Sequence, residues 1–205
     1  MSDAAAIPRV SAERRTHPTA DRLVGLAALV FSPLYLLSDV IEAIQGGFST
    51  GQLWLTLVAE AAIPIFVIGL SVMQLPQLGR LGRVSAVAYA YSYVFFTGTV
   101  VYALIDHTSD YGVLNHDLGW RMTLHGAIMV LAGLGFGSAV IRAGVLPRWT
   151  GIALMTGVVL VALSQNLPEA AQTFAAAIRA LGFAGMGAAL LRPPSGSGPL
   201  NRLSS

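Results

Sequence analysis

The chain contains no cysteine and no lysine, and only 11% of its 205 residues are charged. Without cysteine it forms no disulfide bond, no thiolate metal site and no cysteine nucleophile. Without lysine it forms no Schiff base with a carbonyl substrate. A soluble domain carries about a quarter charged residues, so this composition excludes an ordinary soluble protein.

Hydrophobic residues make up 55% of the chain and gather in six apolar segments. Segments of about 20 apolar residues are long enough to cross a hydrocarbon layer of ~30 Å. The sequence therefore predicts an all-α, polytopic bundle of six transmembrane helices in the cell membrane, with the lipid bilayer as its surroundings. The predicted spans are Arg22 to Gln45, Gly51 to Leu75, Val84 to His107, Leu118 to Ala143, Trp149 to Asn166 and Glu169 to Leu191.

The arginine residues predict how the bundle is oriented. Ten of the twelve fall in the two tails and in the second and fourth loops, and none falls in the other loops. Because basic residues favour the cytoplasmic side, we expect both termini to be cytoplasmic. We also expect one membrane domain, 21–192, between disordered tails at 1–20 and 193–205. A net charge of only +2 with arginines confined to loops gives no reason to expect a nucleic-acid partner.

Polar side chains within the spans concentrate in the outer half of the bilayer. At 1.5 Å per helical residue, Glu60 lies about 14 Å, Arg179 about 15 Å and His125 about 10 Å from the outer surface. A charge near the bilayer centre costs at least ~2.5–3.5 kcal/mol, so such groups turn inward and find partners. The sequence therefore predicts one cavity in the outer half, shared by several spans.

Four residues are the candidate catalytic groups: Glu60, Asp39, Glu42 and His125. Burial of a lone carboxyl group favours its protonated form, which suits Glu60 to a general acid. Two neighbouring carboxyl groups can divide acid and base roles, which suits Asp39 and Glu42. The structural alternatives are an ion pair between Glu60 and Arg179, solvated headgroup-level acids, and a core histidine bonded to a carbonyl.

Further polar and aromatic residues near the outer ends of the spans are candidates for orienting a substrate. They are Tyr35, Tyr102, Asp106, Arg121, Asn166 and Arg179. The histidine and acidic residues match no tight metal-ligand spacing such as HExxH. P-loop and dinucleotide fingerprints are absent as well. We therefore expect neither a metal nor another cofactor.

These features favour an integral membrane enzyme that performs cofactor-independent acid/base chemistry, a cyclisation or an isomerisation, on an apolar small molecule. One alternative is a proton-coupled carrier with Glu60 and Arg179 as its midplane switch. Another is a non-catalytic membrane subunit or sensor that binds a partner through the acidic third loop, with Asp106, Asp110 and Asp117. The sequence leaves open whether the chain forms a homo-oligomer.

In size, helical make-up and embedded acidic residues, the chain resembles the small integral-membrane terpene cyclases. That resemblance implies protonation of an epoxide or alkene by a membrane-embedded acid, although those cyclases typically have seven spans. The run from Leu124-His125-Gly126 to Leu146-Pro147-Arg148-Trp149 also resembles small six-span membrane proteins of high-GC bacteria. The second resemblance implies no activity.

Overall fold

The computed structural model describes residues 18–192, which fold into seven α-helices with no strand among them. The predicted tails lie outside the described residues, except that the first helix already begins at Pro18. The helices are α1 (Pro18–Gln45), α2 (Thr50–Met73), α3 (Gly79–Asp106), α4 (Tyr111–Leu118), α5 (Trp120–Ala143), α6 (Arg148–Leu163) and α7 (Glu169–Leu191).

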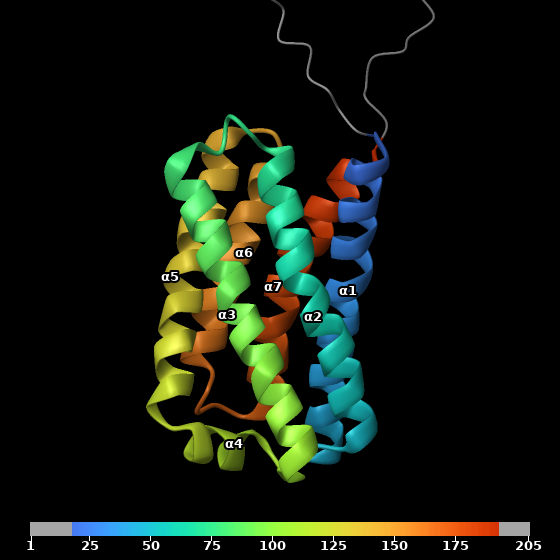
Figure 1. Ribbon diagram of the computed structural model, residues 1–205, viewed down its shortest axis with the longest axis vertical. Helices are drawn as coiled ribbons and strands as arrows, with labels where there is room; N and C mark the ends of the chain where they lie inside the picture. The colour runs from blue at the N-terminus through green and yellow to red at the C-terminus, as the bar shows by residue number, and fades with distance from the viewer. Residues whose placement is uncertain (1–17, 193–205) are drawn as a thin grey trace, which may run out of the picture.

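Six of these helices stand side by side as an antiparallel ring (Figure 1). Each packs against its neighbour in the chain, and α7 returns to pack against α1 and close the ring. Glycines bring the first and last helices together, since a Cβ atom on Gly187 would lie 2.5 Å from the carbonyl oxygen of Gly25. Small residues at such crossings let helix backbones approach closely within a membrane.

Five of the helices, α1, α2, α3, α5 and α7, are long and apolar enough to cross a membrane. The helical fold expected from the sequence is therefore confirmed, and it suits a multi-pass membrane protein. The sixth, α6, has only 16 residues and rises about 24 Å, which is less than the ~30 Å hydrocarbon layer. The count of six spans and the side on which the termini lie remain predictions.

The loop expected between Thr108 and Asp117 contains the short helix α4, which corrects the sequence-based expectation. Asp110 starts it by accepting a hydrogen bond of 3.0 Å from the backbone N–H of Val113. Leu114 holds it in place, because its side chain is buried against Leu53, Val100 and Ala103. A side chain that caps the first turn and one apolar anchor are enough to fold so short a segment.

The two ends of the ring differ in charge and in packing. The α4 end lies opposite the end where α1 begins and α7 ends, which we call the tail end (Figure 1). Exposed arginines gather at the tail end: Arg22, Arg80, Arg83, Arg142, Arg148 and Arg192. The interior of that half is filled by large apolar side chains, among them Phe66, Leu70, Tyr89, Phe136, Phe183 and Met186. No comparable cluster fills the half nearer α4 within the described residues, and this difference positions the site described next.

Candidate functional site

A cavity of about 680 Å³ occupies the half of the ring nearer α4. All six helices of the ring and α4 contribute to its wall, each through the part that lies toward this end. Residues at its outer end, including Asn115, Gln165 and Glu169, are exposed, so the cavity reaches the surface there. Its deep end stops at the packed aromatic side chains of the opposite half. The cavity therefore lies at the end of the ring away from the exposed arginines, the end that the arginine pattern predicts to be the outer one.

The structure brings six of the ten candidate site residues into the wall of this cavity. They are Tyr35, Asp39, Glu42, Glu60, Asn166 and Arg179. They come from α1, α2, α7 and the turn after α6, segments that lie apart in the sequence and meet only because the ring closes. Three carboxyl groups, a phenol, an amide and a guanidinium therefore face one space.

Glu60 lies at the deep part of the wall, and its side chain is only 2% exposed. The hydroxyl of Tyr35 donates a hydrogen bond of 3.4 Å to Oε1 of Glu60. Oε2 is buried and has no hydrogen-bond partner among the described residues. Because Oε1 already accepts from Tyr35, a proton on this carboxyl group is best carried by Oε2.

Arg179 is buried in the same region, with 7% of its side chain exposed. Its guanidinium carbon lies 5.1 Å from the centre of the Tyr35 ring, a cation–π contact. Within residues 18–192 the only contact shorter than 4.0 Å between an acidic and a basic side chain joins His116 to Asp117, so the Glu60–Arg179 ion pair, one of the structural alternatives, is not formed. A small hollow of about 10 Å³, lined by both Asp39 and Arg179, lies beside the main cavity.

The backbone position of Arg179 is fixed by a close helix crossing. A Cβ atom on Gly157 of α6 would lie 2.5 Å from the Cα atom of Arg179 in α7, closer than real Cβ atoms approach. Only glycine permits this crossing with the present backbone. The sequence alone gave no reason to attach a role to this glycine, because the partner of a small residue is visible only in three dimensions.

Two polar residues of α2 that sequence reasoning missed extend the acidic wall. Gln52 and Thr56 precede Glu60 by eight and four residues, so all three lie on one face of the helix. The side-chain amide of Gln52 donates hydrogen bonds to Thr56 Oγ1 (2.9 Å) and Glu42 Oε2 (3.4 Å). The four-residue spacing of Gln52, Thr56 and Glu60 could have revealed these residues in the sequence. It indicates a polar stripe that runs along α2 from the open end of the cavity toward Glu60.

His125 does not line the cavity, although the sequence made it a catalytic candidate. Its ring stacks on Phe95 with centroids 3.6 Å apart, between α3 and α5. Nδ1 lies 2.8 Å from the carbonyl oxygen of Arg121, and since a carbonyl can only accept, Nδ1 carries the proton. In the neutral ring Nε2 then accepts from the Tyr91 hydroxyl at 3.1 Å. Both nitrogens are occupied, one of them by the backbone carbonyl that the structural alternative expected, but the ring is only half-buried and lies outside the core.

Tyr102, Asp106 and Arg121 also lie outside the cavity wall, and each is exposed. The guanidinium of Arg121 lies 5.9 Å from the Trp120 ring at the beginning of α5. Helical spacing places such residues on a common face, but only the rotation of each helix decides whether that face looks inward. For these three the rotation turns them away from the cavity.

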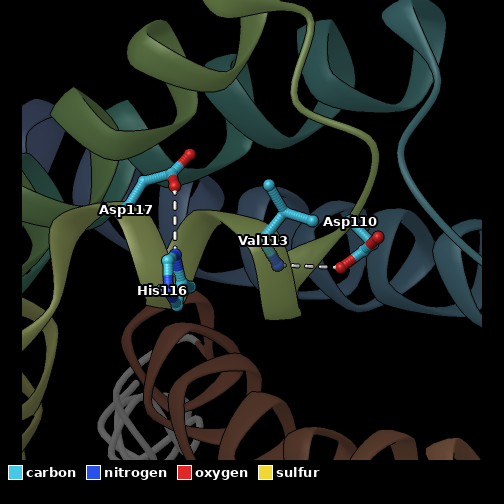
Figure 2. A network of polar contacts seen from close by, with 4 residues as sticks. All are labelled: Asp110, Val113, His116 and Asp117. Carbon is cyan, nitrogen blue, oxygen red and sulfur yellow. Dashed lines mark hydrogen bonds and ion pairs between the residues drawn. The ribbon is translucent and has the colours of Figure 1, made fainter.

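At the α4 end, a surface network surrounds the short helix (Figure 2). Asp110 caps the helix, and Nδ1 of His116 lies 3.4 Å from Oδ1 of Asp117. The Val113 N–H and the Ser109 hydroxyl hold the pKa of Asp110 below its ordinary value. Among residues 18–192 no three His, Asp or Glu side chains lie close enough together to hold a metal ion.

No protein-family model matches this chain, and neither does any curated protein or solved structure with which it was compared. The likeness to terpene cyclases accordingly stays a prediction that rests on size and embedded acids. What the chain does has to be argued from the cavity itself.

Proposed function

We propose that the protein is a membrane-embedded enzyme that performs acid/base chemistry, a cyclisation or an isomerisation, on a small molecule held in this cavity. The observation that carries the proposal is the state of Glu60: a buried carboxyl group in the wall of a large cavity, with one oxygen bonded to Tyr35 and the other without a partner among the described residues. A proton held on that second oxygen has no acceptor within this part of the protein. A substrate is the acceptor that the site provides for.

The reaction needs one group that gives a proton and another that takes one. Glu60 gives the proton on Oε2 to the substrate, and Asp39 takes the proton that a neighbouring carbon loses. The substrate then has rearranged bonds and unchanged composition. Glu42, half-buried nearer the cavity end and bonded to Gln52, passes protons between the two acids and water, which resets their states. Three carboxyl groups in different surroundings favour this division of roles.

The surroundings of the acids suit chemistry that must avoid water. Apolar side chains such as Leu53, Phe96, Val100 and Met129 line the cavity beside the polar ones. The deep end of the cavity lies away from its opening, so the acids there meet less water, which strengthens electrostatic interactions and protects a reactive intermediate. Tyr35, whose ring packs against Arg179, holds Oε1 of Glu60 by its hydrogen bond, which limits the movement of the other oxygen.

The packed half of the ring argues against the carrier alternative. A carrier needs polar groups that continue to the other side of the membrane. Beyond Glu60 the interior is filled by Phe66, Tyr89, Phe183 and their apolar neighbours. The partner-subunit alternative leaves the cavity and its buried acids without a purpose. The enzyme proposal makes use of both features.

The experiment that tests the proposal uses deuterium. The purified full-length chain, in lipid vesicles, is incubated in D2O with an apolar extract of the cells from which it derives. A step that exchanges protons with Glu60 places deuterium in a product, which mass spectrometry detects by its added mass, whatever the compound is. We expect a labelled compound with the wild type and with the surface control Asp117→Asn, and none with Glu60→Gln. Equal labelling by Glu60→Gln, or no labelled compound at all, contradicts the proposal.

A further inference from the structure

The cavity wall carries more acidic than basic groups. Within residues 18–192 it contains four carboxyl groups, those of Asp39, Glu42, Glu60 and Glu169, against the single guanidinium of Arg179. The two carboxyl groups nearer the cavity end, Glu42 and Glu169, have no basic residue beside them in the wall, as far as the described residues extend. An anion that enters therefore meets repulsion, and a cation meets attraction that grows as water is excluded.

Unused hydrogen-bonding atoms point to the same class of ligand. Oε2 of Glu60 and Oε1 of Gln52 are buried oxygens without partners among residues 18–192, and both belong to residues of the wall. A buried amide oxygen, and a buried carboxylate oxygen once its proton has gone to the ligand, are normally bonded to a donor. The donor that suits an acidic, partly apolar cavity is the N–H group of an ammonium ion.

Arg179 does not reverse this preference. Its guanidinium already lies over the Tyr35 ring and shares a small hollow with Asp39. Asp39 and Glu60 outnumber it in its own part of the wall. Its positive charge is thereby opposed within the protein, whereas Glu42 and Glu169 lack such compensation in the described wall.

We propose that the cavity takes an apolar molecule that carries a basic amine, bound as its ammonium form with N–H groups directed at Glu60 and Asp39. When Glu60 is protonated and the amine enters uncharged, the O–H bond at Oε2 breaks, the nitrogen lone pair takes the proton, and a carboxylate is left opposite the ammonium ion. An amine that enters already protonated displaces the same proton to water by way of Glu42. In both cases Glu42 returns a proton to Glu60 before Glu60 acts as the acid of the proposed reaction. This inference names the substrate class of the proposed enzyme and rests on it only in using the same cavity.

Four probes with the same adamantane cage test the charge preference separately from turnover. They are 1-adamantylammonium, its N,N,N-trimethyl derivative, 1-adamantanol and 1-adamantanecarboxylate, measured by calorimetric titration into the full-length protein in detergent micelles. We expect the ammonium to bind about tenfold to a hundredfold more tightly than the alcohol, because its hydrogen bonds are charge-assisted. The trimethyl derivative, which has no N–H group, should bind more weakly than the ammonium.

Variants of the wall and of the surface complete the test. Glu60→Gln should reduce ammonium binding to the level of the alcohol and leave alcohol binding unchanged, which also shows that the variant is folded. Asp39→Asn should weaken the ammonium as well, whereas Asp117→Asn removes one negative charge at the same end and should change nothing. Tightest binding of the carboxylate, with its loss in Arg179→Gln, would overturn the inference. Equal binding of all four probes, or binding of none, would do the same.

The two proposals can fail separately. If the protein binds the ammonium most tightly but no deuterium-labelled product forms, the proposed enzymatic step is wrong and the proposed ligand class stands. If a labelled product forms and depends on Glu60, but the protein binds the carboxylate or the alcohol more tightly than the ammonium, the proposed enzyme stands and the amine as its substrate is wrong.

Discussion

The hydroxyl of Tyr35 in α1 donates a hydrogen bond of 3.4 Å to Oε1 of Glu60 in α2, while the face of the same ring receives Arg179 from α7. One aromatic side chain therefore ties three helices together at the deep end of the cavity. The two contacts use different parts of the residue, so substitution can separate them.

Tyr35→Phe removes the hydroxyl and keeps the ring. We expect a loss of about 1–3 kcal/mol in stability, because a buried carboxyl oxygen is left without its donor. Tyr35→Leu, which also removes the ring face beneath Arg179, should be less stable again by about 0.5–2 kcal/mol. Thermal unfolding in detergent orders the three proteins, and identical midpoints for Phe and Leu would show that the cation–π contact contributes nothing.

Gly157→Ala should displace Arg179 although it touches no ligand. The added Cβ atom would meet the Arg179 backbone at 2.5 Å, so α6 and α7 must separate, at a cost of about 1–3 kcal/mol. We expect a lower unfolding midpoint and weaker binding in the cavity. The matched control is Gly98→Ala in α3, where a Cβ atom meets nothing within 4 Å among the described residues. A control that is destabilised as much as Gly157→Ala would contradict the account.

His125→Ala should lower stability and spare the cavity. The substitution removes the stack on Phe95 and the bonds to the Tyr91 hydroxyl and the Arg121 carbonyl. We expect a loss of about 1–3 kcal/mol, with ligand affinity and deuterium incorporation per folded molecule unchanged. A stable variant that loses deuterium incorporation would restore His125 to the catalytic set.

Lowering the pH should destabilise α4, because it protonates the capping residue Asp110. The N–H of Val113 lowers the pKa of Asp110 below 3.8 in the folded protein, so the cap's stabilisation is complete above that pH. It is lost as the pH falls below about 3.8 and through the lowered folded value. The amide resonance of Val113 should follow this transition in wild type. Asp110→Asn still caps the helix and should abolish the transition, and an unchanged transition in that variant would assign it to another group.

The arrangement of the bundle was largely readable from the sequence, because two simple patterns determine it. Apolar segments of fixed length predicted the helices, and the arginines Arg80, Arg83, Arg142 and Arg148 marked the end of the ring away from the cavity. Counting residues along a helix predicted that Glu60 and Arg179 lie at a similar level of the bundle, and both line the same cavity. These inferences need only the rise per residue and the sign of the loop charges.

Rotation about each helix axis was not readable in the same way. Arg121 and His125 share a face of α5, and that face looks toward Phe95 and the surface instead of the cavity. The predicted depth of these two residues did not indicate whether their side chains point into the cavity or away from it. Gln52 and Thr56 were missed because an uncharged polar residue costs little free energy in an apolar helix. Its presence in such a helix therefore does not by itself indicate a site. The Gly157 crossing depends on which helix closes the ring, which no local pattern specifies.

The central claim is that a cavity open toward α4, and closed toward the tail end where α1 begins and α7 ends, contains the acids. Because the native chain has no cysteine, single cysteines placed at Thr56 and Thr99 in the cavity wall and at Ser85 in the packed half can be labelled without background. The direct measurement is their reaction rate with a membrane-impermeant methanethiosulfonate added outside intact cells. The account predicts reaction at Thr56→Cys and Thr99→Cys and none at Ser85→Cys. Reaction at Ser85→Cys alone, or at none of the three, would contradict it.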